Sequence, residues 1–396
     1  MLRRGLDDSF PADVRQHVTA LTLARTTANA CYRFAPPFLA TIAHGNGTDL
    51  AGIGIAVAIS ELSGLLSPFN GEIVERLHRR TAMTLGLSGV GLGTLLAASS
   101  VHTVMFAIAL VIIAQSKVMF DLGLGAWISD RVPFAQRGRI IGLTETSWAL
   151  GLLVGVSAMG LVTAATNWRV GYVVGAMGVV ALAAYVGRTL PADAGAHTAA
   201  GRPARGKVSV RSVAPLMLAM FSLMAASQAL FVTFGSHLED TFEFTPATLS
   251  AMAFGLGFGE LIASLLSSWR ADRWGKERSA AAGATMMVPA AVGLALWHEH
   301  LWVALPMLVV AIASFEFAIV SAIPLGTAAV AGSPARGMAL MLGAGTSGRA
   351  VMSITATRAY TAHGMAWPAL LCGAFATLSG TTFLTLRHRR RGRQRV

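Results

Sequence analysis

GEIVERLHRR occupies residues 71–80 and SWRADRWGKER occupies residues 268–278, and the two stretches share one charge pattern. Each contains an acid, Glu75 or Asp272, that is followed at once by arginine and then by further basic residues. The two acids lie 197 positions apart, and half of the 396-residue chain is 198. A repeat at this period predicts a duplicated chain whose two halves have a similar fold.

A second motif repeats at nearly the same distance. Pro133 and Arg137 in the first half match Pro334 and Arg336 in the second, and the two arginines are 199 positions apart. In both copies a glycine follows the arginine. Every copy of the two motifs falls between long apolar stretches, an organisation that is typical of transporters built from repeats.

The composition is that of a membrane protein. Apolar residues make up 54% of the chain and charged residues only 13%, and the mean hydropathy is +0.60. Windows of about 20 mostly apolar residues recur along the chain, and each is long enough to cross about 30 Å of hydrocarbon as a helix. The windows do not alternate between apolar and polar positions, so a β-barrel is excluded.

We therefore predict an all-α integral membrane protein with twelve transmembrane helices in two pseudo-symmetric six-helix bundles. The N-terminal bundle spans residues 1–188, a linker spans 189–211, and the C-terminal bundle with its basic tail spans 212–396. The predicted helices cover residues 17–41, 50–70, 82–100, 104–128, 140–163, 168–187, 212–235, 247–268, 280–298, 302–327, 338–357 and 366–386.

The distribution of basic residues predicts the orientation. Of the 31 Lys and Arg residues, 25 fall on one side of this topology, two (Arg169 and Arg358) fall on the other, and four lie within spans. By the positive-inside rule both termini are cytoplasmic, in a bacterial inner membrane. The basic tail at 387–395 is expected to bind anionic lipid headgroups rather than nucleic acid, and we expect a monomer.

Three tryptophans and two cysteines lie at informative positions. Trp168, Trp302 and Trp367 are placed at predicted outer ends of spans, where interfacial anchoring explains them. Cys31 and Cys372 fall inside apolar windows, so we expect no structural disulfide.

Motifs for ATP hydrolysis, zinc proteolysis or a nucleophile elbow are absent from the sequence. We therefore expect no enzyme activity, no cofactor and no metal site, and a proton gradient as the source of energy.

The repeated motifs resemble those of a known family. Gly71, Glu75-Arg76 and Arg79-Arg80 are similar to the loop signature between the second and third helices of the major facilitator superfamily, and Asp272-Arg273 with Gly275-Lys276 is similar to its second-half copy. The resemblance covers the whole chain and is to twelve-helix, proton-coupled drug or metabolite efflux members. It implies two bundles around a central cavity that opens to one side at a time.

The resemblance also implies a conformational latch. In that family the loop acid and arginines bridge to neighbouring helix ends and hold the outward-facing state, a role that charge-assisted bonds can serve. The alternative is that these charges only set the topology. The residues concerned are Gly71, Glu75, Arg76, Arg79, Arg80, Asp272 and Arg273.

The chain departs from the family pattern at two positions. Met119 stands where the fourth helix of the family has an arginine, and Val156 stands where its fifth-helix antiporter motif has a proline. The second departure weakens the case for antiport.

Charged side chains inside the spans are candidate functional residues, because each costs about 2.5–3.5 kcal/mol or more at the centre of a membrane. The eight candidates are Arg33, Glu61, Lys117, Asp121, Glu145, Glu260, Glu316 and Arg349.

Depth along the spans suggests how these charges pair. Counting residues from the loops at 1.5 Å per residue places Arg33 near Glu61 and Arg349 near Glu316, and Lys117 and Asp121 are four apart on one helix. Each carboxylate in these pairs either has a structural role or is a site at which a proton or the substrate competes with the paired base.

Two acids remain after this pairing. Glu145 lies near the cytoplasmic end of its span, where it meets water, Arg131 or Arg139. Glu260 lies well inside a span, where a desolvated carboxyl either carries a proton or is a protonated acid hydrogen-bonded to a neighbouring helix.

Polar and aromatic residues of three spans are candidates for lining the substrate cavity, with ordinary helix packing as the equal alternative. They are Asn29, Tyr32, Trp148, Ser227, Gln228 and Phe231.

The sequence thus favours a secondary transporter that exports a small amphipathic or cationic compound in exchange for protons. The alternatives are a proton symporter or uptake carrier for a small, anionic metabolite, and, from another class, a membrane-embedded lipid enzyme or receptor.

Overall fold

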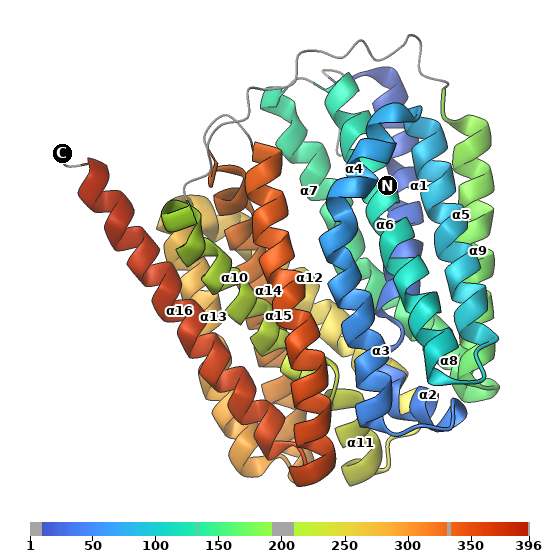
Figure 1. Cartoon of the computed structure of the whole chain (residues 1–396), viewed down its shortest axis with the longest axis vertical. Coiled ribbons are helices and arrows are strands. Elements are labelled where there is room, and N and C mark those ends of the chain that lie inside the picture. The colour runs from blue at the N-terminus through green and yellow to red at the C-terminus, as the bar shows by residue number, and fades with distance from the viewer. Residues whose placement is uncertain (1–9, 133, 192–209, 331–333, 395–396) are drawn as a thin grey trace. The chain divides into compact units, whose positions relative to one another are not determined.

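The computed structural model describes residues 10–132, 134–191, 210–330 and 334–394. Side chains at 68, 75, 134–139, 141–142, 210–212, 268–269, 271–272, 334–336 and 388–394 fall outside this description. The described chain is helical almost throughout and contains no strand, which confirms the all-α prediction (Figure 1).

The helices follow the predicted spans closely. In the first half they are α1 (Ala12–Arg33), η2 (Pro36–Phe38), α2 (Leu39–Gly45), α3 (Leu50–Ser63), η3 (Gly64–Leu66), α4 (Ser67–Arg76), α5 (Arg79–Ala98), α6 (Thr103–Arg131), α7 (Phe134–Leu150), η4 (Gly151–Val156), α8 (Ser157–Ala165) and α9 (Trp168–Thr189). In the second half they are α10 (Val210–Phe231), α11 (Phe234–Phe242), α12 (Pro246–Trp274), α13 (Lys276–Trp297), α14 (Leu301–Thr327), α15 (Pro334–His363) and α16 (Ala366–Gln394).

Nine helices in the described part of the chain are long and apolar enough to cross a membrane. The remaining predicted spans fall on α1, on the shorter apolar stretch Leu50–Leu66, and on α15. Arg25 and Arg33 in α1 and Arg349 in α15 lower the mean hydropathy of their helices. The count of twelve spans therefore stays a prediction.

Side-chain caps fix where several helices begin. The carboxylate of Asp49 accepts from the backbone N–H of Gly52 at the start of α3, and the Asn167 side chain accepts from the N–H groups of Arg169 and Val170 at the start of α9. Such residues satisfy donors that a helix leaves free at its N-terminus.

The helices form two compact units. Unit 1 comprises Met1–Gly47, Leu66–Ala196 and Thr245–Gly257, and unit 2 comprises Thr48–Leu65, His197–Phe244 and Phe258–Val396. Each unit thus includes a short segment from the other half of the sequence. The domain boundaries at 188 and 212 stay a prediction.

Within each unit the helices pack against one another in a defined set of pairs. In unit 1, α5 lies between α6 and α9, and α1 contacts α6, α7, η4 and α9 (Figure 1). In unit 2, α13 packs against α14 and α16, and α10 packs against α15 and α16. The segment α3 packs on α15 within unit 2.

One close helix contact occurs twice. In unit 1, a Cβ on Gly86 of α5 would lie 2.7 Å from the backbone nitrogen of Phe120 in α6. In unit 2, a Cβ on Gly283 of α13 would lie 2.8 Å from the backbone nitrogen of Ala318 in α14. The glycines are 197 residues apart and their partners 198. Glycine is needed at both because the backbones approach so closely, and the duplication is therefore visible in the packing.

The predicted span 140–163 is interrupted by a π-helical segment, η4. The Ser157 hydroxyl donates to the carbonyl oxygen of Leu152, five residues earlier. A Cβ on Gly151 would lie 2.8 Å from Asn29 Cβ, so this glycine allows α1 to approach η4 closely.

The prediction that Trp168 is an interfacial anchor is wrong. The residue is only 3% exposed and its ring contacts Phe106 and Tyr172, whereas Trp302 is 88% and Trp367 50% exposed. The tryptophan is buried because its ring packs into an aromatic cluster of unit 1, which loop position alone does not reveal.

Candidate substrate and proton site

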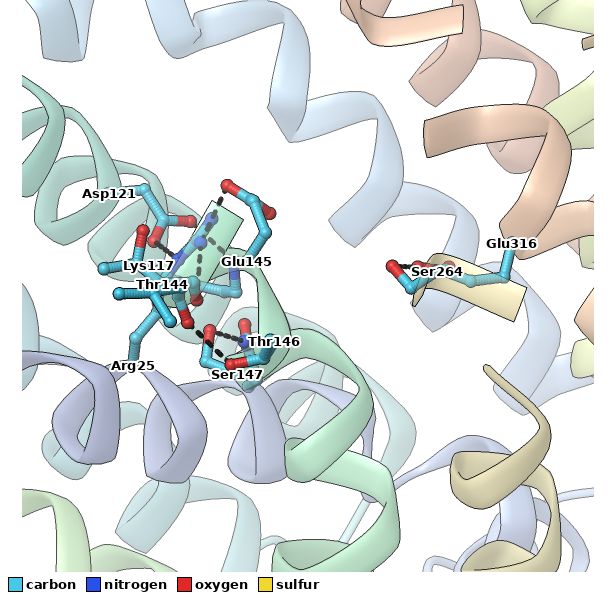
Figure 2. A network of polar contacts seen from close by, with 11 residues as sticks. Arg25, Lys117, Asp121, Thr144, Glu145, Thr146, Ser147, Ser264 and Glu316 are labelled. Atoms are coloured by element: carbon cyan, nitrogen blue, oxygen red, sulfur yellow. Dashed lines mark hydrogen bonds and ion pairs between the residues drawn. The ribbon is translucent and has the colours of Figure 1, made fainter. Parts of the chain in front are cut away.

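The candidate site in unit 1 is built around Arg25 of α1 (Figure 2). Arg25 Nε lies 2.9 Å from Asp121 Oδ1 of α6, and Nη1 lies 2.8 Å from Glu145 Oε1 of α7. Nη1 also donates to the carbonyl oxygen of Thr144 at 3.1 Å. A guanidinium can hold several acceptors at once because its donors form a rigid fork. One side chain therefore joins three helices.

Asp121 has a second cation. Lys117 Nζ lies 2.6 Å from Asp121 Oδ2, one helical turn earlier in α6, which confirms the predicted pair. The carboxylates are the more exposed members of these pairs, at 24% for the Asp121 side chain and 44% for the Glu145 side chain. The two cations are more deeply buried, at 14% for Arg25 and 11% for Lys117.

Arg25 is one residue that sequence reasoning missed. It lies within the first predicted span but is not among the eight candidates, and the pairing by depth therefore leaves it out. For Glu145, which pairs with Arg25 in the structure, the sequence predicts contact with water, Arg131 or Arg139. The described Arg131 binds Asp13 instead, at 2.9 Å. The signal that was available is a charged residue in an apolar span, the criterion used for the others.

Aromatic rings lie next to these charges. Arg33 Cζ is 4.4 Å from the ring centroid of Trp148, and Arg33 Nη1 donates to the Trp148 carbonyl oxygen at 2.9 Å. Lys117 Nζ lies 5.7 Å from the Tyr32 centroid and 5.6 Å from the Trp148 centroid. These distances are in the range of cation–π attraction. Four predicted site residues are thus brought together.

Two other predicted lining residues take part in contacts between helices. In unit 1, Asn29 Nδ2 donates to Ser147 Oγ at 3.2 Å. In unit 2, Gln228 Nε2 donates to Ser353 Oγ at 2.8 Å. Both amides are buried, and their contacts agree with the packing alternative.

Three carboxyls are buried in unit 2. Arg349 Nη2 lies 2.7 Å from Glu61 Oε1, a pair that depth counting did not foresee. Glu316 Oε1 accepts from Ser264 Oγ at 3.2 Å (Figure 2). Glu260 has no exposed surface. The predicted pair of Arg33 with Glu61 would cross the two units and stays a prediction.

The loop motif of the first half makes a specific contact at the end of α6. Arg79 Nε lies 3.0 Å from Asp130 Oδ2, and Nη1 donates to the Val74 carbonyl oxygen at 3.0 Å. Arg80 Nη1 donates to the Leu190 carbonyl oxygen at 3.3 Å. Asp130 was not predicted.

The latch role of the other predicted residues stays a prediction. The side chains of Glu75 and Asp272 lie outside the described residues. Arg76 and Arg273 are exposed, and a Cβ on Gly71 would meet no described atom within 4 Å.

No group of three or more His, Cys, Asp or Glu side chains that could hold a metal ion occurs in the part of the chain that the structure describes.

Apolar helices that enclose buried charged networks define a multi-pass membrane protein with an internal polar site. A sequence profile of the Major Facilitator Superfamily matches residues 21–357. The chain belongs to this superfamily, and it is a membrane transporter of a small molecule rather than an enzyme.

Relatives in Bacillus subtilis (strain 168) agree. The chain is 24% identical over 379 residues to the uncharacterized MFS-type transporter YwfA, a match that covers 91% of this chain and 89% of that protein. It is 25% identical over 126 residues to Multidrug resistance protein 2, which covers 32% of this chain and 31% of that protein.

Solved structures share the fold at low identity. The human organic anion transporter MFSD10 (TETRAN) has a TM-score of 0.70 and 18% identity, over 95% of this chain and 100% of that chain. A bacterial homologue of the human lysosomal transporter Spinster, inward-facing and occupied, has a TM-score of 0.69 and 15% identity, over 94% of this chain and 93% of that chain.

Proposed function

We propose that this chain is a secondary active transporter that exports a small amphipathic or cationic compound in exchange for protons, by alternating access. The observation that carries this proposal is the sharing of Arg25 between two membrane carboxylates, Asp121 and Glu145.

The physical argument is one of competition. A carboxylate that pairs with an arginine can exchange that partner for a proton or for a substrate cation, because all three satisfy the same negative charge. A proton and a cationic substrate then exclude each other from one carboxylate. Exchange of the two across the membrane follows if the site faces each side in turn.

Other buried carboxyls are proposed as additional proton carriers. Glu260, Glu61 and Glu316 lie in unit 2, and each is at most 6% exposed. A carboxyl is retained in such a place at a cost in stability, which supports a role in coupling. Glu260 remains our preferred candidate among them.

The setting of the transporter is also proposed. The charge distribution supports a bacterial inner membrane with both termini in the cytoplasm and anionic lipids near the basic tail. We propose a monomer that uses the proton gradient, without a cofactor and without nucleic acid as a partner. The likeness to Multidrug resistance protein 2 supports export.

A second candidate function is uptake or proton symport of a small anionic metabolite. Arg33 and Lys117 both lie against Trp148, and two cations beside an aromatic ring could also hold a carboxylate with a flat apolar body. MFSD10, which shares the fold of this chain, is an organic anion transporter, and this is in line with the second function.

The test uses inverted membrane vesicles that contain the protein. The lumen is acidified by respiration, the gradient is followed with a quenched dye, and cationic, neutral and anionic amphiphiles are added in turn. Protein-dependent recovery of fluorescence with a cationic compound is the expected result.

Glu145→Gln should abolish this recovery, and the matched control Glu299→Gln, an exposed acid at an outer turn, should not. Recovery that is unchanged in Glu145→Gln would show that the shared carboxylates do not carry the exchange. Protein-dependent transport of anions alone would favour the second function.

A further inference from the structure

The surroundings of Lys117 have the composition of a site for an organic cation. Its ammonium lies 5.7 Å from the centroid of Tyr32 and 5.6 Å from that of Trp148, and 2.6 Å from Asp121 Oδ2. Two aromatic rings and a carboxylate are the groups that recognise ammonium ions in proteins. Here the ion that occupies them belongs to the chain itself.

The recognising groups remain partly open. Tyr32 and Trp148 are half-buried, and the Asp121 side chain is 24% exposed, so each offers surface to a ligand. The residue Lys117 is only 9% exposed. The lysine is thus more deeply buried than the groups that it contacts, and those groups keep exposed surface for a ligand.

Lys117 is the cation that can leave. Its ammonium is a point charge on a flexible four-carbon stem. Arg33, the other cation beside Trp148, is held by a hydrogen bond of 2.9 Å to the Trp148 carbonyl oxygen.

Asp121 does not lose its last cation when Lys117 moves away. Arg25 Nε lies 2.9 Å from Oδ1, on the other oxygen from the one that Lys117 contacts. The carboxylate therefore stays paired on one side and has its second oxygen available for an incoming cation.

We propose that Lys117 is a tethered competitor, which occupies the Tyr32, Trp148 and Asp121 site until the ammonium group of an organic monocation displaces it. The inference rests on the proposed function, since it names the substrate class of that site: an aromatic or otherwise flat apolar body that carries one ammonium group. The lysine then lowers the affinity of the site for substrate, whereas an ordinary ligand-binding residue raises it.

The first experiment measures binding of benzyltrimethylammonium to the purified full-length protein in detergent by titration calorimetry. Lys117→Met should tighten the Kd by about 3- to 30-fold, the range set by the cation–π contacts that the lysine gives up. Lys117→Arg keeps the competing charge and should not tighten it. Trp148→Leu should weaken binding. An unchanged or weaker Kd in Lys117→Met would overturn the proposal.

Anion binding is measured in parallel with benzoate as the probe. Weaker benzoate binding in Lys117→Met, without tighter binding of the cation, would show that the lysine serves an anionic substrate and would also overturn the proposal.

The second experiment needs no variant and does not depend on how Lys117→Met folds. The chain has three lysines, Lys117, Lys207 and Lys276. Reductive methylation followed by mass spectrometry should label Lys117 faster when benzyltrimethylammonium is present, because the displaced ammonium becomes accessible. Lys276 should be labelled at an unchanged rate. Protection of Lys117 by the cation would contradict displacement.

The failure of this inference differs from the failure of the proposed function. Binding and labelling are measured without a membrane gradient, so they do not depend on proton exchange. Displacement without proton-coupled transport would leave the site intact and reject the antiport function. Proton-coupled transport without displacement of Lys117 would support the antiport function and reject the role of Lys117 as a competitor.

Discussion

Arg349 of α15 and Glu61 of α3 form an ion pair of 2.7 Å across 288 positions of the sequence. The side chain of Glu61 is 6% exposed and that of Arg349 15%. Glu61 belongs to the segment Thr48–Leu65, which packs with the second half of the chain in unit 2. An ion pair therefore links a residue from the first half of the sequence to one from the second half.

Removing one partner should destabilise unit 2. Glu61→Gln removes the carboxylate that lies 2.7 Å from the largely buried Arg349 side chain, and breaking a buried ion pair costs about 3–5 kcal/mol. We expect a lower thermal unfolding midpoint of the purified protein, and partial recovery in the exchanged pair Glu61→Arg/Arg349→Glu. The control Glu299→Gln should not change the midpoint. A midpoint that is equally low in the exchanged pair would argue against a direct contribution of this contact.

Arg25→Lys tests the fork that holds two carboxylates. A lysine can pair with Asp121 or Glu145 but does not span both with a rigid geometry. One lost charge-assisted bond, worth about 1.5–3 kcal/mol, should reduce the transport rate by about 10- to 150-fold. Initial rates of efflux in vesicles, corrected for protein amount, check this. Arg358→Lys, at an exposed position, is the matched control, and equal rates in both variants would contradict the role of Arg25.

The contact of Arg79 with Asp130 predicts a non-additive double variant. Asp130→Asn removes the pair alone, whereas Arg79→Gln also removes the bond to the Val74 carbonyl oxygen. Arg79→Gln should therefore have the larger effect on the unfolding midpoint, and the double variant should be no worse than Arg79→Gln. Coupling of about 0.5–3 kcal/mol is usual for residues in contact. Strictly additive losses would mean that the two side chains act independently.

Glu260→Gln tests the preferred proton carrier in unit 2. Glutamine fills nearly the same volume but cannot exchange a proton, so the dependence of transport on pH should disappear while the unfolding midpoint stays close to that of the unaltered protein. Transport is measured over a range of pH in vesicles, with Glu299→Gln as the reference. If the pH dependence persists in full, the coupling role lies with another carboxyl.

The repeated glycine contact predicts matched losses of stability. Gly86→Ala and Gly283→Ala each place a Cβ under 3 Å from the backbone of the neighbouring helix, and such overpacking costs about 1–3 kcal/mol. Both variants should lower the unfolding midpoint. Gly125→Ala and Gly255→Ala, where no described atom lies within 4 Å of the new Cβ, should be neutral or slightly stabilising. A loss in one copy only would show that the two contacts are not equivalent.

Much of the fold was predictable because its signals are local. Long apolar windows fix the helices, and the spacing of Glu75 and Asp272 indicated a duplication that Gly86 and Gly283 show in the packing. The pair Lys117–Asp121 was predictable for the same reason, since both residues lie on one helix.

The candidate site was less predictable because depth along a helix does not identify which helices are neighbours. Counting from the loops paired charges on consecutive spans. The contacts of Arg349 with Glu61, and of Arg25 with Asp121 and Glu145, join helices that are distant in sequence. Finding them requires the order of the helices around each unit and the rotation of each helix, and a single sequence fixes neither.

The π-helical segment Gly151–Val156 changes how this chain should be compared with its relatives. A π-helical turn holds one residue more than an α-helical turn, so the residues before and after it are out of phase by about 100° relative to a continuous α-helix. A helical wheel drawn through residues 140–163 therefore assigns one side of the segment to the wrong face. Relatives with an uninterrupted helix should be aligned to this chain with a single-residue gap here, and a shifted register would otherwise hide which of their residues corresponds to Trp148.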